Sequence, residues 1–322
     1  MKRKVTILAV LLCAAFGLLA ASGVVSSTKN PLQVALLHWY QANRVPTSFP
    51  AGGFTLGVAF DGASIWAANA GSNSFNVMKF RASDGLLLGT FPTGGNQPTN
   101  LAFDGANMWV SNSLSNNVAK LRASDGALLG TFSVGTNPSG EVFDGANIWV
   151  ANAGSNNVTK LRASDGMTLG TFGVGTTPIA MAFDGTNIWV TNAGSGNVNK
   201  LNLSGTTLGT FGVGSSPEGI AFDGKNLWVT NFGSNNVTKL SLSGTTAGTF
   251  AVGTSPLGIA FDGAHMWVAN HGNNSVTELN LSGANLGTFA VGNDPWGVAF
   301  DGANIWVANQ FFCCAAGTVS KL

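Results

Sequence analysis

The sequence predicts an all-β protein, a seven-bladed β-propeller whose blades each contain four strands. Three observations predict this fold class. A unit of about forty residues occurs seven times, each unit reads as four short apolar segments separated by turn residues, and no unit shows a helical period. Repeats of four short strands are typical of propeller blades. Because the composition stays uniform from about residue 50 onward, we expect one repetitive domain over 47–322.

Asp-Gly pairs mark the repeat. They occur at Asp61, Asp104, Asp144, Asp184, Asp223, Asp262 and Asp301, which gives spacings of 43, 40, 40, 39, 39 and 39 residues. A Trp stands five residues after each Asp, at Trp66, Trp109, Trp149, Trp189, Trp228, Trp267 and Trp306. The step from 40 to 39 coincides with a shorter turn, in which RASDG becomes LSG. Such length changes are expected in surface turns, so the seven units form one array.

Each unit contains four segments, which we name strands a to d in chain order. Typical examples are G-V-A-F, N-I-W-V-A-N, N-V-T-K-L and L-G-T-F-S-V-G. Asp-Gly separates a from b, and Ser-Asp-Gly or Ser-Gly separates c from d; these residues tolerate the positive φ of tight hairpins. A ring of Asp residues could instead bind calcium, but the Gly after each Asp favours turn chemistry. The run I-W-V-A is apolar at successive positions, which predicts a strand covered on both faces.

The seven repeated Trp residues have two interpretations. They could stack on sugar rings, or they could pack in the core between blades. Every unit places the Trp at the same position in strand b, and a side chain of this size buries about 150–250 Å². The regular recurrence therefore favours a structural role.

The last unit stops after strand c, at 317–322. Residues 47–53 (T-S-F-P-A-G-G) resemble residues 90–95 (T-F-P-T-G-G), which end the first unit. We therefore expect the N-terminal segment to supply strand d of blade seven. A propeller closed in this way has no open seam between its first and last blades.

The N-terminus has the pattern of a signal peptide. Lys2, Arg3 and Lys4 precede an apolar run, which small residues follow. We expect residues 1–23 to be removed, although an uncleaved membrane anchor is the alternative. Residues 24–46 form a leader, in which Asn30 and Pro31 are typical of a helix start; a short docking helix and a weakly ordered leader both remain open. The mature protein would then be exported to the periplasm, the cell surface or the medium, without a membrane span.

The charge content argues against nucleic acid as a partner. Only 9% of the residues are charged, the formal net charge is +1, and the basic residues do not form a stripe. No Cys/His spacing resembles a zinc site, so we expect neither a metal nor another cofactor. An unknown protein, a glycan or a small molecule remains as the partner, and we expect a monomer.

Two strand b segments read W-V-T-N, starting at Trp189 and Trp228, and three more read W-V-A-N. These segments resemble the defining tetrapeptide of the YVTN family of β-propeller repeat proteins, and the resemblance covers residues 47–322. It implies an extracytoplasmic or surface protein used for binding. It does not imply an activity, because a fold does not carry a function.

A second propeller family, the streptogramin lyases, offers a contrast. Its repeats place an acidic residue after W-F-T, and its chemistry uses His, Glu and a magnesium ion. In this chain Asn stands at the matching places, and only His271 with Glu278 offers a loose acid–base pair.

Positions that vary among the seven units are candidates for a site. Strands alternate in direction, so the b–c loops and d–a connections share one face of the propeller. There, the residue after the connection proline, where strand a enters near the channel mouth, varies as Thr99, Ser139, Ile179, Glu218, Leu257 and Trp296, and Leu56 is the corresponding residue of blade one. We expect a ligand at this opening and take as candidates Glu218, Trp296, Asp294, Glu141, His271 and Phe232. Ordinary loop variability is the alternative interpretation.

The loop of blade seven is the sharpest irregularity. It reads Q-F-F-C-C-A-A over 310–316 and contains Cys313 and Cys314, the only thiols left after removal of the signal peptide. Adjacent cysteines can form a strained disulfide ring, pair between chains, or stay reduced; an exported location permits oxidation.

Three functions compete. The sequence favours a non-enzymatic binding or interaction scaffold that uses its loop-rich face. A propeller-type lyase or lactone hydrolase, with a divalent metal at the channel mouth, is the alternative, and a structural surface-layer component is the third.

Overall fold

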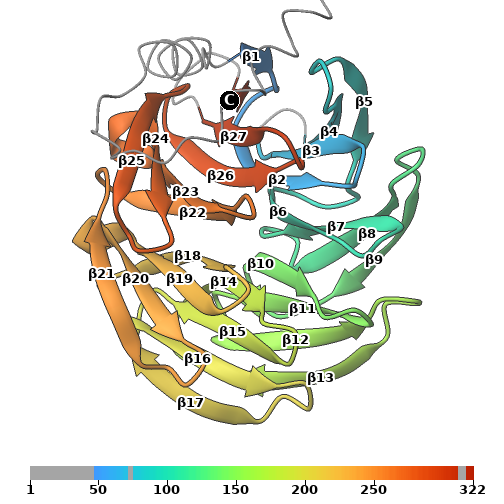
Figure 1. Cartoon of the computed structure of the whole chain (residues 1–322). Coiled ribbons are helices and arrows are strands. Elements are labelled where there is room, and N and C mark those ends of the chain that lie inside the picture. Colours follow the sequence, from blue (N-terminus) through green and yellow to red (C-terminus); the bar gives the residue numbers. More distant parts are fainter. Residues whose placement is uncertain (1–46, 72–74, 311–316) are drawn as a thin grey trace, which may run out of the picture. The chain divides into compact units, whose positions relative to one another are not determined.

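The computed structural model describes residues 47–71, 75–310 and 317–322. They form seven four-stranded antiparallel sheets, which follow one another around a ring (Figure 1). The predicted seven-bladed propeller is confirmed. The proposed signal peptide, the leader, and Cys313 and Cys314 lie outside the described residues. Within the described ranges, no helix is long and apolar enough to cross a membrane.

The strands follow the order expected from the repeat. Strands a are β2 (Thr55–Phe60), β6 (Pro98–Phe103), β10 (Pro138–Phe143), β14 (Pro178–Phe183), β18 (Pro217–Phe222), β22 (Pro256–Phe261) and β26 (Pro295–Phe300). Strands b are β3 (Ser64–Asn69), β7 (Asn107–Asn112), β11 (Asn147–Asn152), β15 (Asn187–Asn192), β19 (Asn226–Asn231), β23 (His265–Asn270) and β27 (Ile305–Asn309).

The outer half of each blade is equally regular. Strands c are β4 (Asn76–Arg81), β8 (Asn117–Arg122), β12 (Asn157–Arg162), β16 (Asn197–Asn202), β20 (Asn236–Ser241), β24 (Ser275–Asn280) and β28 (Thr318–Lys321). Strands d are β5 (Leu87–Pro92), β9 (Leu128–Ser133), β13 (Thr168–Gly173), β17 (Thr207–Gly212), β21 (Thr246–Ala251), β25 (Asn285–Ala290) and β1 (Thr47–Pro50). Two 3-10 turns, η1 (Phe232–Ser234) and η2 (His271–Asn273), follow strands b of blades five and six.

The Asp-Gly turn and the Trp belong to one local unit. In blade five, Asp223 accepts hydrogen bonds from the backbone N–H of Lys225 (2.8 Å) and of Asn226, and its second oxygen accepts one from Trp228 Nε1 (2.7 Å). Gly224 has the positive φ, 88°, that the turn requires. Burial alone would raise the pKa of Asp223, but these hydrogen bonds outweigh it and hold the pKa below its usual value. The Asp side chain of the Asp-Gly turn therefore accepts hydrogen bonds from the turn amides and from the Trp indole.

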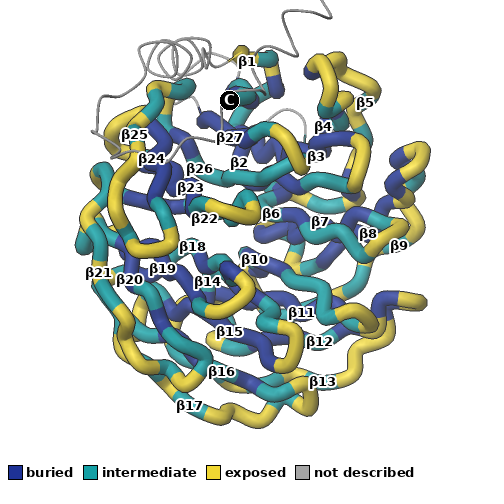
Figure 2. Tube along the Cα trace, in the orientation of Figure 1, coloured by how far each residue is buried: buried dark blue, intermediate teal, exposed yellow. Residues whose placement is uncertain are grey.

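The Trp side chains form the core between neighbouring blades. All seven are at most 2% exposed, and Trp66 packs with Val77 of its own blade against Met108 and Leu121 of the next. Each Trp also contacts a Phe of strand d at a ring distance of 5.4–5.7 Å. The sugar-stacking interpretation is wrong, because the rings are not accessible. Strands b are buried and strands d are largely exposed, as Figure 2 shows by colour.

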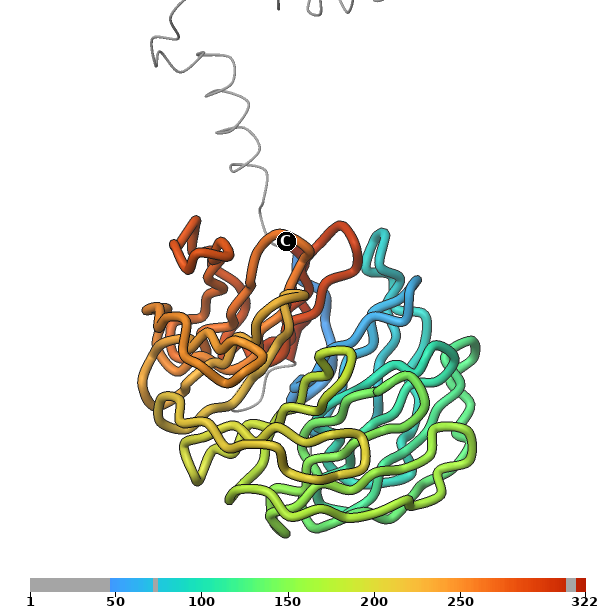
Figure 3. The backbone as a smooth tube through the Cα atoms, turned by 60° about the horizontal axis from the view of Figure 1, so that its bottom comes forward, coloured from blue at the N-terminus to red at the C-terminus, as the bar shows by residue number. Residues whose placement is uncertain are grey.

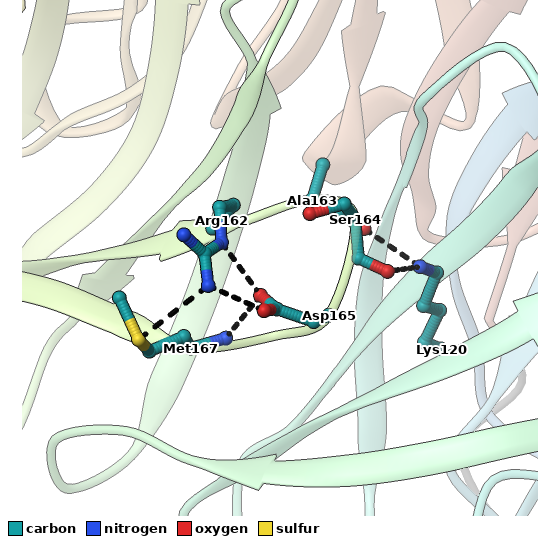
Figure 4. Close-up of polar contacts among 6 residues, drawn as sticks. All are labelled: Lys120, Arg162, Ala163, Ser164, Asp165 and Met167. Atoms are coloured by element: carbon teal, nitrogen blue, oxygen red, sulfur yellow. Dashed lines mark hydrogen bonds and ion pairs between the residues drawn. The ribbon is translucent and has the colours of Figure 1, made fainter.

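A lysine in strand c connects each blade to the next in six cases. Lys120 Nζ lies 5.2 Å from the centre of the Trp109 ring and donates hydrogen bonds to the carbonyls of Ala163 and Ser164 in the following blade (Figure 4). The same contact recurs at Lys79, Lys160, Lys200, Lys239 and Lys321. We call this contact the lysine latch; it joins a cation–π contact with a charged hydrogen bond.

The N-terminal strand closes the ring. β1 pairs with β28, and Phe49 stacks on Trp306 at 5.7 Å, where the other blades use the Phe of their own strand d. Gly85, in the c–d turn of blade one, lies so close to the Phe49 ring that a Cβ there would clash with it. Lys321 adds the latch from blade seven to Ala82 and Ser83 of blade one. The two ends of the propeller domain therefore meet side by side, as Figure 3 also shows.

Blade six departs from the latch pattern. Glu278 replaces the lysine, and its carboxylate lies 3.3 Å from His265 Nδ1. In blade seven, strands c and d come from distant parts of the chain, so no c–d turn joins them. A lysine at position 278 would lack the turn carbonyl that accepts its hydrogen bond in the other blades.

Candidate functional site

A β-bulge at the start of every strand a positions the variable residue. In blade five, Glu218 and Gly219 together lie opposite the single residue Thr230, between the pairs Pro217↔Asn231 and Ile220↔Val229. Bulges re-aim side chains, and Glu218 accordingly lines the central channel. The residue after it must be small, because a Cβ on Gly219 would lie 2.4 Å from the carbonyl oxygen of Leu257 in the next blade.

The Thr of W-V-T-N holds these bulges in place. Thr191 Oγ1 accepts a hydrogen bond from Ala180 N–H (3.0 Å) and donates one to the carbonyl of Glu218 (2.8 Å). Thr230 makes the corresponding contacts to Gly219 N–H and to the carbonyl of Leu257. The Thr of each W-V-T-N segment thus holds the backbone of a channel residue in the following blade, Glu218 in one case and Leu257 in the other.

The variable residues lie together, as a ring at the channel mouth. All seven line a channel cavity of about 230 Å³. A larger cavity of about 850 Å³, which we call the mouth cavity, shares five of them: Leu56, Thr99, Glu218, Leu257 and Trp296. Its other walls come from d–a connections and b–c loops: Phe54, Ala70, Phe75, Gln97, Ser113, Leu114, Asn137, Phe232, His271 and Gln310. Four of the sequence candidates, Glu218, Trp296, His271 and Phe232, thus meet in one cavity.

Glu218 is the one carboxylate among the described residues that line the mouth cavity. Burial raises its pKa to about 7, and no hydrogen bond or ion pair from the described residues offsets this effect. No Lys or Arg lines the cavity within the described ranges. Its carboxyl group therefore titrates near neutral pH and has no counter-ion there.

Aromatic side chains and an amide surround this carboxylate. The rings of His271 and Trp296 meet edge to face at 6.0 Å. Phe232 is partly exposed on η1. Gln310 is 6% exposed, and its side-chain oxygen accepts no hydrogen bond in the described structure. The cavity combines an apolar wall with a few polar groups, which is the usual composition of a small-molecule site.

Glu141 lies apart from the mouth cavity. Its carboxylate is buried and accepts hydrogen bonds from Ser111 N–H (3.1 Å) and Ser111 Oγ (2.7 Å) in the preceding blade. Burial raises its pKa to about 8, although these two hydrogen bonds act in the opposite direction. Glu141 thus joins blades two and three and does not line either cavity.

Asp294 is a turn residue. It precedes the connection proline with φ 47°, as the equivalent residues of other blades do, and its carbonyl accepts a hydrogen bond from Gln310 N–H (3.2 Å). It does not line the mouth cavity. Cys313 and Cys314 lie outside the described residues, so the possible disulfide between them is not tested.

The structure does not bring His271 and Glu278 together as an acid–base pair. The strand register places Glu278 opposite Trp267, four residues before His271, where its carboxylate faces His265. In the described part of the chain, no group of three or more His, Cys, Asp or Glu side chains could hold a metal ion.

Sequence reasoning missed part of the cavity wall. Phe75 lies in a two-residue extension of the b–c loop of blade one, and Leu114 stands where the same loop of five other blades has Gly. Both line the mouth cavity. The signal was present, since the first spacing of 43 residues and the missing Gly both break the repeat.

Comparisons with known proteins identify the fold. Virginiamycin B lyase from Staphylococcus aureus is similar to this chain with a TM-score of 0.73 and 19% identity, over 86% of this chain and 98% of the lyase. A hydrazine synthase chain from Kuenenia stuttgartiensis has a TM-score of 0.73 and 20% identity, over 88% and 98%. A streptogramin B lyase has a TM-score of 0.72 and 17% identity, over 86% and 95%.

No family model matches the sequence, and no curated protein matches it. At these identities the likeness shows a shared fold. Because enzymes named for different reactions share it, the fold itself assigns no activity to this chain.

Proposed function

We propose that this chain is a non-enzymatic binding protein that holds a small organic molecule in the mouth cavity. The observation that carries the proposal is the cavity itself, about 850 Å³ in volume and walled largely by aromatic and aliphatic side chains. Small-molecule sites typically have volumes of about 300–1,000 Å³ and such a composition. The position at the mouth of the channel, where seven variable residues converge, supports it further.

A thermal-shift screen with Trp296→Ala tests the proposal. A ligand at about 100 times its Kd stabilises the folded state by about 2.7 kcal/mol, so hits should raise the Tm of the wild-type protein. The same hits should give little shift with Trp296→Ala. Leu208→Ala is the matched control, because Leu208 is an exposed apolar residue on the outer strand β17. Hits that stabilise Trp296→Ala as strongly as the wild type would place the ligand elsewhere.

A propeller-type lyase or hydrolase is the second candidate. Glu218 and His271, two groups used in acid–base catalysis, line one cavity, and similar solved structures include virginiamycin B lyase. A divalent metal at the channel mouth would be required. A large rise in Tm with magnesium or calcium that Glu218→Gln abolishes would favour this candidate over a binding protein.

We also propose that the protein is exported and that its repeats are of the YVTN type. The basic residues and apolar run of residues 1–23 support export, and the W-V-T-N segments support the repeat type. Mass spectrometry of the protein recovered from a bacterial host tests export. A mature chain that begins near residue 24 is expected; recovery only of the full-length chain would contradict it.

A further inference from the structure

The mouth cavity contains an acidic side chain without a basic partner among the described residues, and this limits which ligands can bind there. The inference about the ligand's charge rests on the proposed small-molecule site. Among the described residues that line it, Glu218 is the one acid, and His271 is the one other residue with an ionisable side chain. Among the residues that the structure describes, no Lys or Arg lines the cavity.

An anionic ligand would meet a like charge in a partly desolvated site, which is costly. A neutral apolar ligand would leave the carboxylate without a partner and with less water. A cation removes both costs, because it supplies the missing counter-ion and a charged hydrogen bond.

The aromatic wall favours the same charge. Trp296, Phe232, Phe54 and Phe75 line the cavity together with Glu218. The faces of aromatic rings attract cations, and Trp does so most strongly. These rings also offer a large apolar surface to the rest of a ligand.

Gln310 supplies a second polar group that needs a donor. Its side chain is 94% buried, and its Oε1 atom accepts no hydrogen bond from the described residues. A buried acceptor of this kind is costly unless a ligand or water donates to it. A protonated amine has two or three N–H donors, enough for Glu218 and one further acceptor.

We propose that the mouth cavity selects molecules that carry a protonated amine on an apolar, ring-containing body, with the ammonium group on the Glu218 carboxylate and the ring against Trp296. Glu218 is the residue that sets the charge preference, and the aromatic wall provides affinity that does not depend on charge.

Binding should depend on pH. Without a ligand, the pKa of Glu218 is raised to about 7 by burial, and a bound cation favours the ionised form. The affinity for a cation should therefore increase as the pH rises from about 5.5 to 7 and level off above about 8.

Three dansyl probes of similar size and different charge test the proposal by fluorescence titration. They are dansylcadaverine (cationic), N-butyldansylamide (neutral) and dansylglycine (anionic). One charged hydrogen bond corresponds to a difference of about 10- to 100-fold in Kd. The wild-type protein should bind the cationic probe more tightly than the neutral probe by this factor at pH 8, and the anionic probe most weakly.

Three variants separate the contributions. Glu218→Gln should remove the preference for the cation and leave the neutral probe bound with nearly unchanged affinity. Trp296→Ala should weaken all three probes. Glu141→Gln, which replaces a buried carboxyl group outside the cavity, should bind all three probes as the wild type does.

Each outcome bears on a different claim. Equal affinity for the three probes, or a cation preference that survives in Glu218→Gln, overturns the amine proposal. If Trp296→Ala weakens probes that show no charge preference, the small-molecule site stands without the amine proposal. If no probe binds the wild-type protein, both proposals are contradicted.

Discussion

At the scale of single residues, each repeated position has a structural task that can be stated as a contact. The Asp of the turn accepts from two backbone amides and from the Trp five residues later. The Asn that ends strand b, such as Asn152, donates across the b–c pair to Asn157 and Thr159. Several residues that vary at a repeated position do not have these tasks. Glu218 and Trp296 accordingly line the mouth cavity, whereas the Trp of strand b is buried.

Glu141 shows that a varied position can also serve the scaffold. Its folded pKa, about 8, lies above the value of 4.5 for a free glutamate. The folded protein therefore holds a proton that the unfolded chain releases, and stability falls as the pH rises from about 4.5 to 8. Glu141→Gln removes this dependence. Relative to wild type, the variant should gain stability over that range, on the order of 4 kcal/mol in all.

Thermal unfolding at pH 5 and pH 8.5 checks this prediction. The Tm difference between Glu141→Gln and wild type should be more positive at pH 8.5 than at pH 5. A difference that does not change with pH would show that the buried carboxyl group does not titrate in this range.

At the scale of elements, strands b and c of one blade are joined to the next blade by the lysine latch. We predict that Lys120→Met lowers the free energy of unfolding by about 1–2 kcal/mol, because two carbonyls lose a charged donor and Trp109 loses its cation. Denaturant unfolding measures the change.

Glu278→Met is the matched variant at the same position of blade six. It removes the contact between the buried Glu278 carboxylate and the partly exposed His265, but no latch to the next blade, so it should cost less than Lys120→Met. An equal loss in the two variants would contradict the distinction between the latch and its replacement in blade six.

The sequence predicts the strands well where the repeat is regular, because the same turn and strand residues recur in all seven units. It predicts contacts between blades poorly. The bond of Glu141 to Ser111 joins residues 30 positions apart, and nothing local indicates it. Asp294 was an attractive candidate by residue type, yet its position is a turn with positive φ in most blades. Phe75 and Leu114, in contrast, break the repeat, so the sequence alone could have identified them as candidate cavity residues.

At the scale of the whole molecule, β1 closes the ring by pairing with β28, and we predict that stability depends on this closure. Phe49 occupies in blade seven the place that Phe211 occupies in blade four. Phe49→Ala and Phe211→Ala should therefore lower stability by similar amounts, about 2–3 kcal/mol each, because both rings are partly buried. Deletion of residues 24–53 should lower the Tm sharply. A Phe49→Ala variant that melts as the wild type does would show that β1 is dispensable.

Closure of the ring also matters for the proposed site. The mouth cavity is lined by residues of blades one, two, five, six and seven, so these blades must keep their places in the ring for the cavity to form. We propose that this cavity is the binding site. A crystal structure of the protein with dansylcadaverine would locate the probe. We expect the ammonium nitrogen within about 3 Å of the Glu218 carboxylate and the dansyl ring against Trp296. A probe bound on the a–b turn face or on the outer strands, with the mouth cavity vacant, would contradict it.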